Sequence, residues 1–358
     1  MKIRIFDPTL ALKAEIDSFE TLILTRKFLG IETAELVIPT DASNASELKL
    51  HYILHAGDTK VFEILQRTIT QEDRSMLRVA AFGFGKTLAK RITVPPEGLS
   101  HDSATGSADA VVKAYIDHHL IAPVDSDRAI ACLANRANQA GTTITDKSRY
   151  KNLLDEVVRV LTAAGRGFFF KMEGGKIHFD TYPGQDLTAG NTQGNPPAIF
   201  SAEYDNILDQ TIIESMADAQ TNVYVAGQGE GAVRTIVEAG SATGHLRFEA
   251  FQDARDTDDT SELAYRGLAA QRLGLNTFEA RCDPNSNLVY EADFDLGDTV
   301  TVKAPGLGLS VDRRITEVRE TYQAGQPMQL ELTFGDRVPT IQSTLRVQKN
   351  LIDSVSTQ

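Results

Sequence analysis

Two stretches that lie far apart in the chain carry the same landmarks in the same order. The first has Gly57-Asp58-Thr59, Arg67-Thr68-Ile69-Thr70 and Phe82-Gly83, and the second has Gly297-Asp298-Thr299, Arg313-Arg314-Ile315-Thr316 and Phe334-Gly335. The two intervals between landmarks are 12 and 13 residues in the first stretch and 18 and 19 in the second. Loops accept added residues, whereas a one-residue slip inside a strand inverts its buried face. The pattern therefore predicts a duplicated β-unit, which is more typical of a structural protein than of a catalyst.

A common turn explains the Gly-Asp pair equally well when the pair is taken alone. Glycine permits a positive φ, and aspartate accepts a hydrogen bond from its own backbone two residues on. The repeat hypothesis therefore depends on the recurrence of all three landmarks.

The size and composition are typical of a soluble globular protein with two or more domains. The chain has 358 residues, of which 42% are hydrophobic and 24% charged, so it can bury substantial cores. Its formal net charge of −13 argues against a surface that grips a nucleic-acid backbone, which needs clustered Lys and Arg. The N-terminus alternates like a strand, and no run of about eighteen apolar residues occurs. We therefore expect no membrane-spanning segment, and synthesis and assembly in the cytoplasm.

Hydrophobic spacing divides the chain into β-rich ends and a mixed middle. Alternating apolar residues predict a first β-domain over 1–95, completed by about 199–238. Helical spacing after Ser107 and from about Lys151, followed by a hairpin at 168–181, predicts an α+β domain over 96–198. A helix at about 260–273 precedes the second copy in a β-domain over 239–340, and 341–358 form a C-terminal tail with weak helical spacing.

Two glycine-rich segments resemble nucleotide-binding motifs, but neither has all the residues that its motif requires. Gly85-Lys86-Thr87 ends like a phosphate-binding loop, but Ala80 stands where that motif needs glycine, and Pro95-Pro96 cuts the following helix short. Gly227, Gly229 and Gly231 are spaced G-x-G-x-G, so the third glycine does not match the dinucleotide fingerprint G-x-G-x-x-G. A hairpin turn is the better interpretation of the second segment, and we expect no cofactor.

Candidate metal ligands and nucleophiles are equally weak. His118 and His119 are adjacent, so they point about 100° apart on a helix and cannot share a metal as an i, i+4 pair could. The acidic run from Asp253 to Glu262 lacks the final glutamate of a calcium loop and suits a solvated helix start. Cys132 and Cys282 have no companion ligand at metal spacing and are expected to be small buried hydrophobic residues. We therefore expect no metal and no catalytic residue.

The chain resembles the siphovirus tail proteins of the ReqiPepy-type hub family, which are related in fold to phage baseplate hubs. The matching signals extend over nearly its full length, and the most specific run from Asp283 through Val302. The segments that carry the resemblance are Ile5–Asp7, Leu24–Phe28, Ala34–Leu36, Phe84–Ile92, Tyr150–Leu154, Pro197–Ser201, Tyr204–Leu208, Asn222–Gly227, Asp253–Asp256, Asp283–Tyr290, Asp293–Val302 and Ser310–Glu317. Some related proteins carry a C-terminal lytic or receptor-binding extension, and here we expect any such activity in another chain.

The resemblance implies a mainly β fold with α+β insertions, in which two tube-like β-barrel domains flank a middle α+β domain. It implies a homotrimeric ring at the tail tip of a virion, assembled in the host cytoplasm, that adapts a hexameric tail tube and lets DNA pass. Its partners would be distal tail or tail tube proteins and a central tip or fibre protein. The glycine-rich loops at Gly227, Gly229 and Gly231, and at Pro305, Gly306 and Gly308, are the expected docking loops.

Two other classes of function remain open at the level of sequence. A cell-wall-degrading tail hydrolase would need a deep pocket with perturbed carboxyl groups. A module that binds a host receptor or a carbohydrate is the third class.

Overall fold

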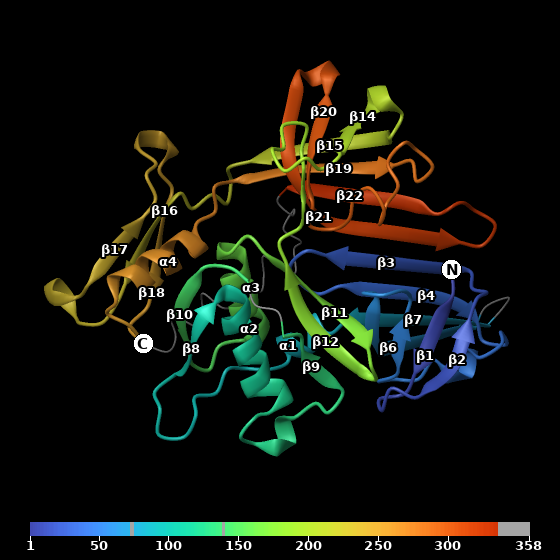
Figure 1. Cartoon of the computed structure of the whole chain (residues 1–358), viewed down its shortest axis with the longest axis horizontal. Helices are drawn as coiled ribbons and strands as arrows, with labels where there is room; N and C mark the ends of the chain where they lie inside the picture. Colours follow the sequence, from blue (N-terminus) through green and yellow to red (C-terminus); the bar gives the residue numbers. More distant parts are fainter. Residues whose placement is uncertain (72–74, 138–139, 336–358) are drawn as a thin grey trace.

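The computed structural model describes residues 1–71, 75–137 and 140–335. The expected C-terminal tail at 341–358 lies outside them. A 14-stranded sheet, in which most neighbours are antiparallel, runs through the molecule (Figure 1). Its main path is β15 (Ile207–Ser215), β19 (Leu275–Cys282), β22 (Gln329–Gly335), β21 (Leu309–Gln323), β3 (Thr21–Lys27), β4 (Thr33–Pro39), β7 (Ser75–Gly83), β6 (Val61–Gln71), β5 (Ile53–His55), β1 (Ile3–Phe6) and β2 (Leu12–Ile16). Beside β21 lies β20 (Thr299–Ala304), which pairs with β13 (Asp186–Leu187) and β14 (Ile199–Ser201).

Period-two alternation builds this sheet and gives it one buried face. In β3, Leu22 and Leu24 are fully buried, while Ile23 between them is partly exposed. Two apolar clusters cover the same sheet, one over the N-terminal strands and one over the strands from β13 to β22. The mainly β prediction is therefore confirmed, with the sheet at the centre of the molecule.

Two sets of strands within the sheet follow the same order. The first set is β6-β7-β4-β3 and the second is β21-β22-β19-β15, all antiparallel. The first strand of each set has one register shift, between Ile64 and Gln66 in β6 and between Ile315 and Glu317 in β21. Each first strand also pairs with a short preceding strand, β5 or β20. Such bulges are fixed features of a strand, so they give a landmark for comparing the two sets.

The shared landmarks of 57–83 and 297–335 do not lie at equivalent positions of the two strand sets, although the strands pair in the same order. The first Gly-Asp-Thr precedes a single long strand, β6, whereas the second precedes two strands, β20 and β21. Ile315 is the last residue paired before its bulge, and so is Ile64, not Ile69. The landmarks are short residue patterns that reflect local turn and strand propensity, so they can recur at positions that are not equivalent. The hydrogen-bonded pairing shows which strands correspond.

The expected pair of closed barrels is also corrected. The 14-stranded sheet is open, and its main path ends at β15 and β2. Residues 199–238 were expected to complete the N-terminal domain, but β14 pairs with β20 beside the second set, and β15 pairs with β19 as a member of that set.

The middle of the chain packs as a mixed α/β region against the sheet (Figure 1). Its predicted helices and hairpin are confirmed. Ser107 caps α2 by accepting a hydrogen bond from the Ala110 amide, and Asn152 caps α3. The elements are α1 (Gly85–Ala89), β8 (Asp102–Ser107), α2 (Ala108–Ile116), a π-helical turn (Asp117–Ile121), β9 (Leu133–Asn135), β10 (Thr143–Ser148), α3 (Leu153–Ala163), β11 (Gly167–Glu173) and β12 (Lys176–Tyr182).

A small three-stranded unit with one helix lies apart from the main sheet, at the left of Figure 1. Its elements are β16 (Asn222–Ala226), β17 (Ile236–Ala239), β18 (Glu249–Asp253) and α4 (Thr260–Ala270). Val223, Val225 and Leu263 form its core. The helix expected at about 260–273 is thus confirmed.

The single-turn 3-10 helices are Ala45–Glu47, Ser126–Arg128, Ala202–Tyr204, Gly231–Val233, Gly244–Leu246 and Pro305–Leu307. No helix in the described ranges has the length and apolar character needed to cross a membrane.

Candidate functional site

Each of the two strand sets has one open strand edge. We call residues 66–71 the β6 edge and residues 209–215 the β15 edge. Beyond Ile64, β6 pairs only with β7, and β15 pairs only with β19, among the strands that the structure describes. All side chains of the β6 edge are exposed. Open edges present unpaired N–H and C=O groups to any approaching strand.

The junction between the two strand sets shows how one such edge is covered. Residues 317–323 of β21 pair antiparallel with residues 21–27 of β3, and this junction makes the sheet continuous. Val318 lies opposite Arg26, and Glu320 lies opposite Leu24, on the buried face. We call this contact the internal junction.

A buried network of charges fastens the internal junction. The Lys60 ammonium lies 2.8 Å from the Glu320 carboxylate and 2.9 Å from that of Glu291. The Arg26 guanidinium donates to the Tyr290 hydroxyl at 2.7 Å and to the Asp295 carboxylate at 2.9 Å. The side chains of Lys60 and Arg26 are each 6% exposed and that of Glu320 only 1%. The attraction in such a site is strong, and breaking one partner is costly.

Burial in and beside this network shifts several titrations. Burial raises the pKa of the Glu32 carboxyl to about 7, against the opposing charge of Arg26. Burial opposes the charge on Arg26, yet the surrounding hydroxyl and carboxyl groups, Tyr290 and Asp295 first, hold its pKa well above the usual value. Burial also raises the pKa of the Tyr290 hydroxyl well above its usual value. Burial and neighbouring charges thus act in opposite directions on Arg26 and on Glu32, and the neighbours prevail at Arg26 while burial prevails at Glu32.

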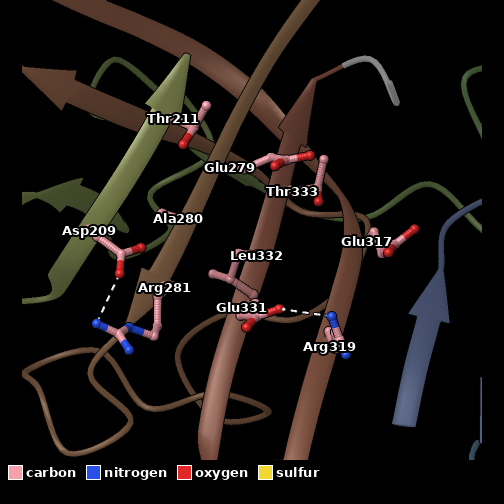
Figure 2. Close-up of a pocket in the computed structure, with 10 residues that line it drawn as sticks. All are labelled: Asp209, Thr211, Glu279, Ala280, Arg281, Glu317, Arg319, Glu331, Leu332 and Thr333. Atoms are coloured by element: carbon pink, nitrogen blue, oxygen red, sulfur yellow. Dashed lines mark hydrogen bonds and ion pairs between the residues drawn. The ribbon is translucent and has the colours of Figure 1, made fainter. Parts of the chain in front are cut away.

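The opposite face of the same strands is polar, charged and hollowed (Figure 2). Asp209, Arg281, Glu331 and Arg319 lie opposite one another on four successive strands, so negative and positive side chains alternate. Figure 2 shows the two ion pairs of this row, Asp209–Arg281 at 2.9 Å and Arg319–Glu331 at 3.4 Å. Their side chains are half exposed, so these ion pairs contribute little to stability. Their charged groups make this face of the sheet polar and solvated.

A second polar row runs beside the first and crosses the internal junction. Glu279 and Glu317 lie in it, and Glu317 faces Lys27 of β3 with an ammonium–carboxylate distance of 4.0 Å. The hollow thus collects four carboxylates, Asp209, Glu279, Glu317 and Glu331, and two guanidinium groups, Arg281 and Arg319.

The structure does not bring the two expected docking loops together. Gly227 is buried at the end of β16, where an added Cβ would lie 2.7 Å from the Thr257 carbonyl, while Gly229 and Gly231 are exposed with positive φ. Pro305, Gly306 and Gly308 are exposed at the tip of the β20–β21 hairpin, where Gly308 has a φ of 63°. The first loop belongs to the small unit and the second to the main sheet (Figure 1).

The segments that resembled chemical motifs have structural contacts. Lys86 lies in the short helix α1, with its ammonium over the Phe82 ring at 5.6 Å. His118 and His119 both contact the buried Asp102 carboxylate, at 2.9 and 2.8 Å. Burial raises the pKa of the Asp102 carboxyl, but these two imidazoles outweigh it and lower the pKa to about 2. Residue spacing does not identify Asp102 as a partner, because it lies 16 residues from His118 on another element.

The acidic run after β18 is a capped helix start. Asp259 caps α4 by accepting hydrogen bonds from the Ser261 and Glu262 amides. Arg266 binds Asp256 and Glu262 at 2.5 to 2.7 Å. Burial raises the pKa of the Asp256 carboxyl, and the hydrogen bonds with Arg266 outweigh it and lower the pKa to about 2. Across the described ranges, no group of three or more His, Cys, Asp or Glu side chains is arranged to hold a metal ion.

The two cysteines differ from each other. Cys282 is buried in the core over β19, and burial raises the pKa of its thiol to about 12, as expected for a small hydrophobic residue. Cys132 is only partly buried, which corrects the expectation for that position.

Comparison with known proteins identifies a family and a fold. The family model described as Siphovirus ReqiPepy6 Gp37-like protein matches residues 2–336. No curated protein matches the chain. The structure is similar to the tail protein from Neisseria meningitidis MC58, with a TM-score of 0.60 and 14% identity over 93% of this chain and 96% of that one. It is also similar to prophage tail protein gp18 from Listeria monocytogenes EGD-e (0.58, 12%, 98% and 99%) and to the 43 kDa tail protein of prophage MuSo2 from Shewanella oneidensis (0.54, 8%, 93% and 97%).

Proposed function

Because the chain belongs to the Siphovirus ReqiPepy6 Gp37-like family, we propose that this phage tail protein is the structural hub of the tail tip, where three copies form a ring. The ring adapts the hexameric tail tube to the tip and lets DNA pass. It is part of the virion and assembles in the cytoplasm of the bacterial host.

The observation that carries this proposal is the repeated strand order. Each chain contributes two sets of four strands in the same order, joined by the internal junction. We infer that the two sets arose by duplication and act as two tube-like β-domains. Three copies then present six equivalent sets, which is the number needed to meet a hexameric tube. An open sheet in one chain suits this function, because the ring closes only when copies meet.

The polar face supports the role of a conduit. The two apolar clusters of the strand sets cover the other face of the sheet, so the charged rows of Figure 2 are the face that would line a lumen. Four carboxylates against two guanidinium groups give the hollow a negative balance. Three chains carry a formal charge of −39, three times −13. A lumen of this sign repels DNA phosphates, and DNA slides past it without binding.

The other regions are suited to contacts outside the lumen. We propose that residues 96–198 form the outer part of the ring as a middle α+β domain. The loop at Gly229 and Gly231 and the hairpin tip at Pro305 to Gly308 are exposed, and they would dock distal tail or tail tube proteins and a central tip or fibre protein. Exposed loop tips tolerate such specialisation without loss of the fold.

Light scattering on the purified chain tests the proposal. A trimer has a mass of about 117 kDa, three times 39.1 kDa. That mass, together with no release of fragments from peptidoglycan, is the expected result. A monomer at concentrations at which tails assemble contradicts the ring. A monomer that degrades peptidoglycan supports the hydrolase instead, and a monomer that binds host glycans supports the receptor-binding module.

A further inference from the structure

The β6 edge and the β15 edge are complementary surfaces within one chain. The β6 edge carries Ile69, which is 63% exposed although it lies opposite buried Leu77 on the core-facing side of the sheet. A large apolar side chain beside unpaired backbone groups is a strong template for another strand. We propose that the β15 edge of a second copy of this chain covers the β6 edge, antiparallel and in one register. This inference rests on the proposed ring and specifies the contact between its subunits.

The internal junction fixes the register. In each strand set, the last residue before the bulge belongs to a row of paired residues with one residue on every strand of the set. Because both bulges lie on the first strand, the two rows of paired residues occupy equivalent positions. The first row is Ile64, Ala81, Ala34 and Leu24, and the second is Ile315, Phe334, Phe278 and Ile212. Leu24, at the end of the first row, pairs with Glu320, five residues after Ile315. Ile212, at the end of the second row, is therefore expected to pair with the residue five positions after Ile64, which is Ile69.

This register brings matching side chains together. Ile69 meets Ile212, an apolar pair on the core-facing side, where the internal junction has Glu320 and Leu24. Two residues along, Arg67 meets Glu214, opposite charges at cross-strand spacing. On the other face, Thr70 meets Thr211. A shift by one residue would place Ile69 opposite Ile213, with their side chains on opposite faces.

The contact is head-to-tail, because it joins two different edges. Each copy offers its β6 edge to one neighbour and its β15 edge to another, as a closed ring requires. Within one chain, the second polar row crosses the internal junction in the same way, from Glu317 to Lys27.

Cysteine cross-linking tests the register. The full chain is prepared with Cys132→Ser to remove the partly exposed thiol, and carries Ile69→Cys with Ile212→Cys. Paired residues on neighbouring strands lie about 4.5 to 5.5 Å apart, within reach of a disulfide. Mild oxidation should convert the chain to covalent multimers up to the trimer on a non-reducing gel. The matched control, Ile69→Cys with Ile213→Cys, should stay mostly monomeric on the same gel.

A second pair keeps the test decisive if the first variant fails to fold. Thr70→Cys with Thr211→Cys replaces two exposed residues and should cross-link equally. A trimer by light scattering that cross-links through 69 and 213, or through neither pair, overturns the register while the proposed hub stands. A monomeric wild-type protein overturns the ring itself.

Discussion

Removal of the Lys60 ammonium is expected to destabilise the fold by about 3 kcal/mol. In the Lys60→Met variant, the Glu320 carboxylate, 1% exposed, loses its cation at 2.8 Å. Uncompensated buried charges of this kind cost about 3 to 5 kcal/mol. The Tyr322 hydroxyl still donates to Glu320 at 2.6 Å and Tyr290 at 3.3 Å, so the cost should fall at the low end of that range. A loss of about 3 kcal/mol raises the unfolding equilibrium constant by about two orders of magnitude.

Urea unfolding followed by circular dichroism, at one protein concentration, measures this change. The exposed Lys2–Glu15 pair, at 3.0 Å, gives the matched control, and Lys2→Met should cost less than about 1 kcal/mol. Lys60→Met combined with Glu320→Leu should recover much of the loss, because no buried charge is then left alone. If Lys60→Met unfolds within about 1 kcal/mol of the wild type at an unchanged m-value, the network does not hold the junction and this reasoning is refuted.

Three other perturbations have defined outcomes. Burial raises the pKa of Glu32 from 4.5 to about 7, so the folded state binds a proton more tightly than the unfolded state and stability falls as pH rises between those values. Glu32→Gln should remove up to roughly 3 kcal/mol of that decline, measured by urea unfolding at pH 5 and pH 8. Deletion of Pro305 to Gly308 should weaken docking to purified tails in a pull-down while leaving the circular dichroism spectrum unchanged, and a collapse of the spectrum would show that the hairpin tip is needed for folding. Lys86→Ala should leave calorimetric ATP binding unchanged, since none is expected, and saturable binding by the wild type that the variant lacks would show a nucleotide site.

Local patterns in the sequence were enough to predict the element types. The caps at Ser107 and near Lys151, and the hairpin at 168–181, depend on neighbouring residues, so spacing and turn chemistry identify them. The mainly β character follows from alternation in the same way. The family was recognised from segments that extend over nearly the whole chain.

Strand equivalence could not be read from the sequence, because pairing depends on residues far apart. Phe278 and Ala34 occupy equivalent positions with only a short Thr-x-Glu pattern in common, which is too short to identify a repeat, whereas the longer Arg-x-Ile-Thr matches do not occupy equivalent positions. The Lys60–Glu320 contact joins residues 260 positions apart, and Lys60 directly follows the Gly-Asp-Thr turn. A lysine after a turn is ordinarily a solvated residue, so only the fold shows that it is buried.

The central claim is that three copies of this chain form a ring at the tail tip. Electron cryomicroscopy of the purified particle tests it most directly. The account predicts a threefold-symmetric ring of this chain at the tip, with two strand sets from each copy around an open channel and the polar rows facing that channel. A tail tip without density for this chain, or with single copies attached outside a tube formed by other proteins, would contradict it.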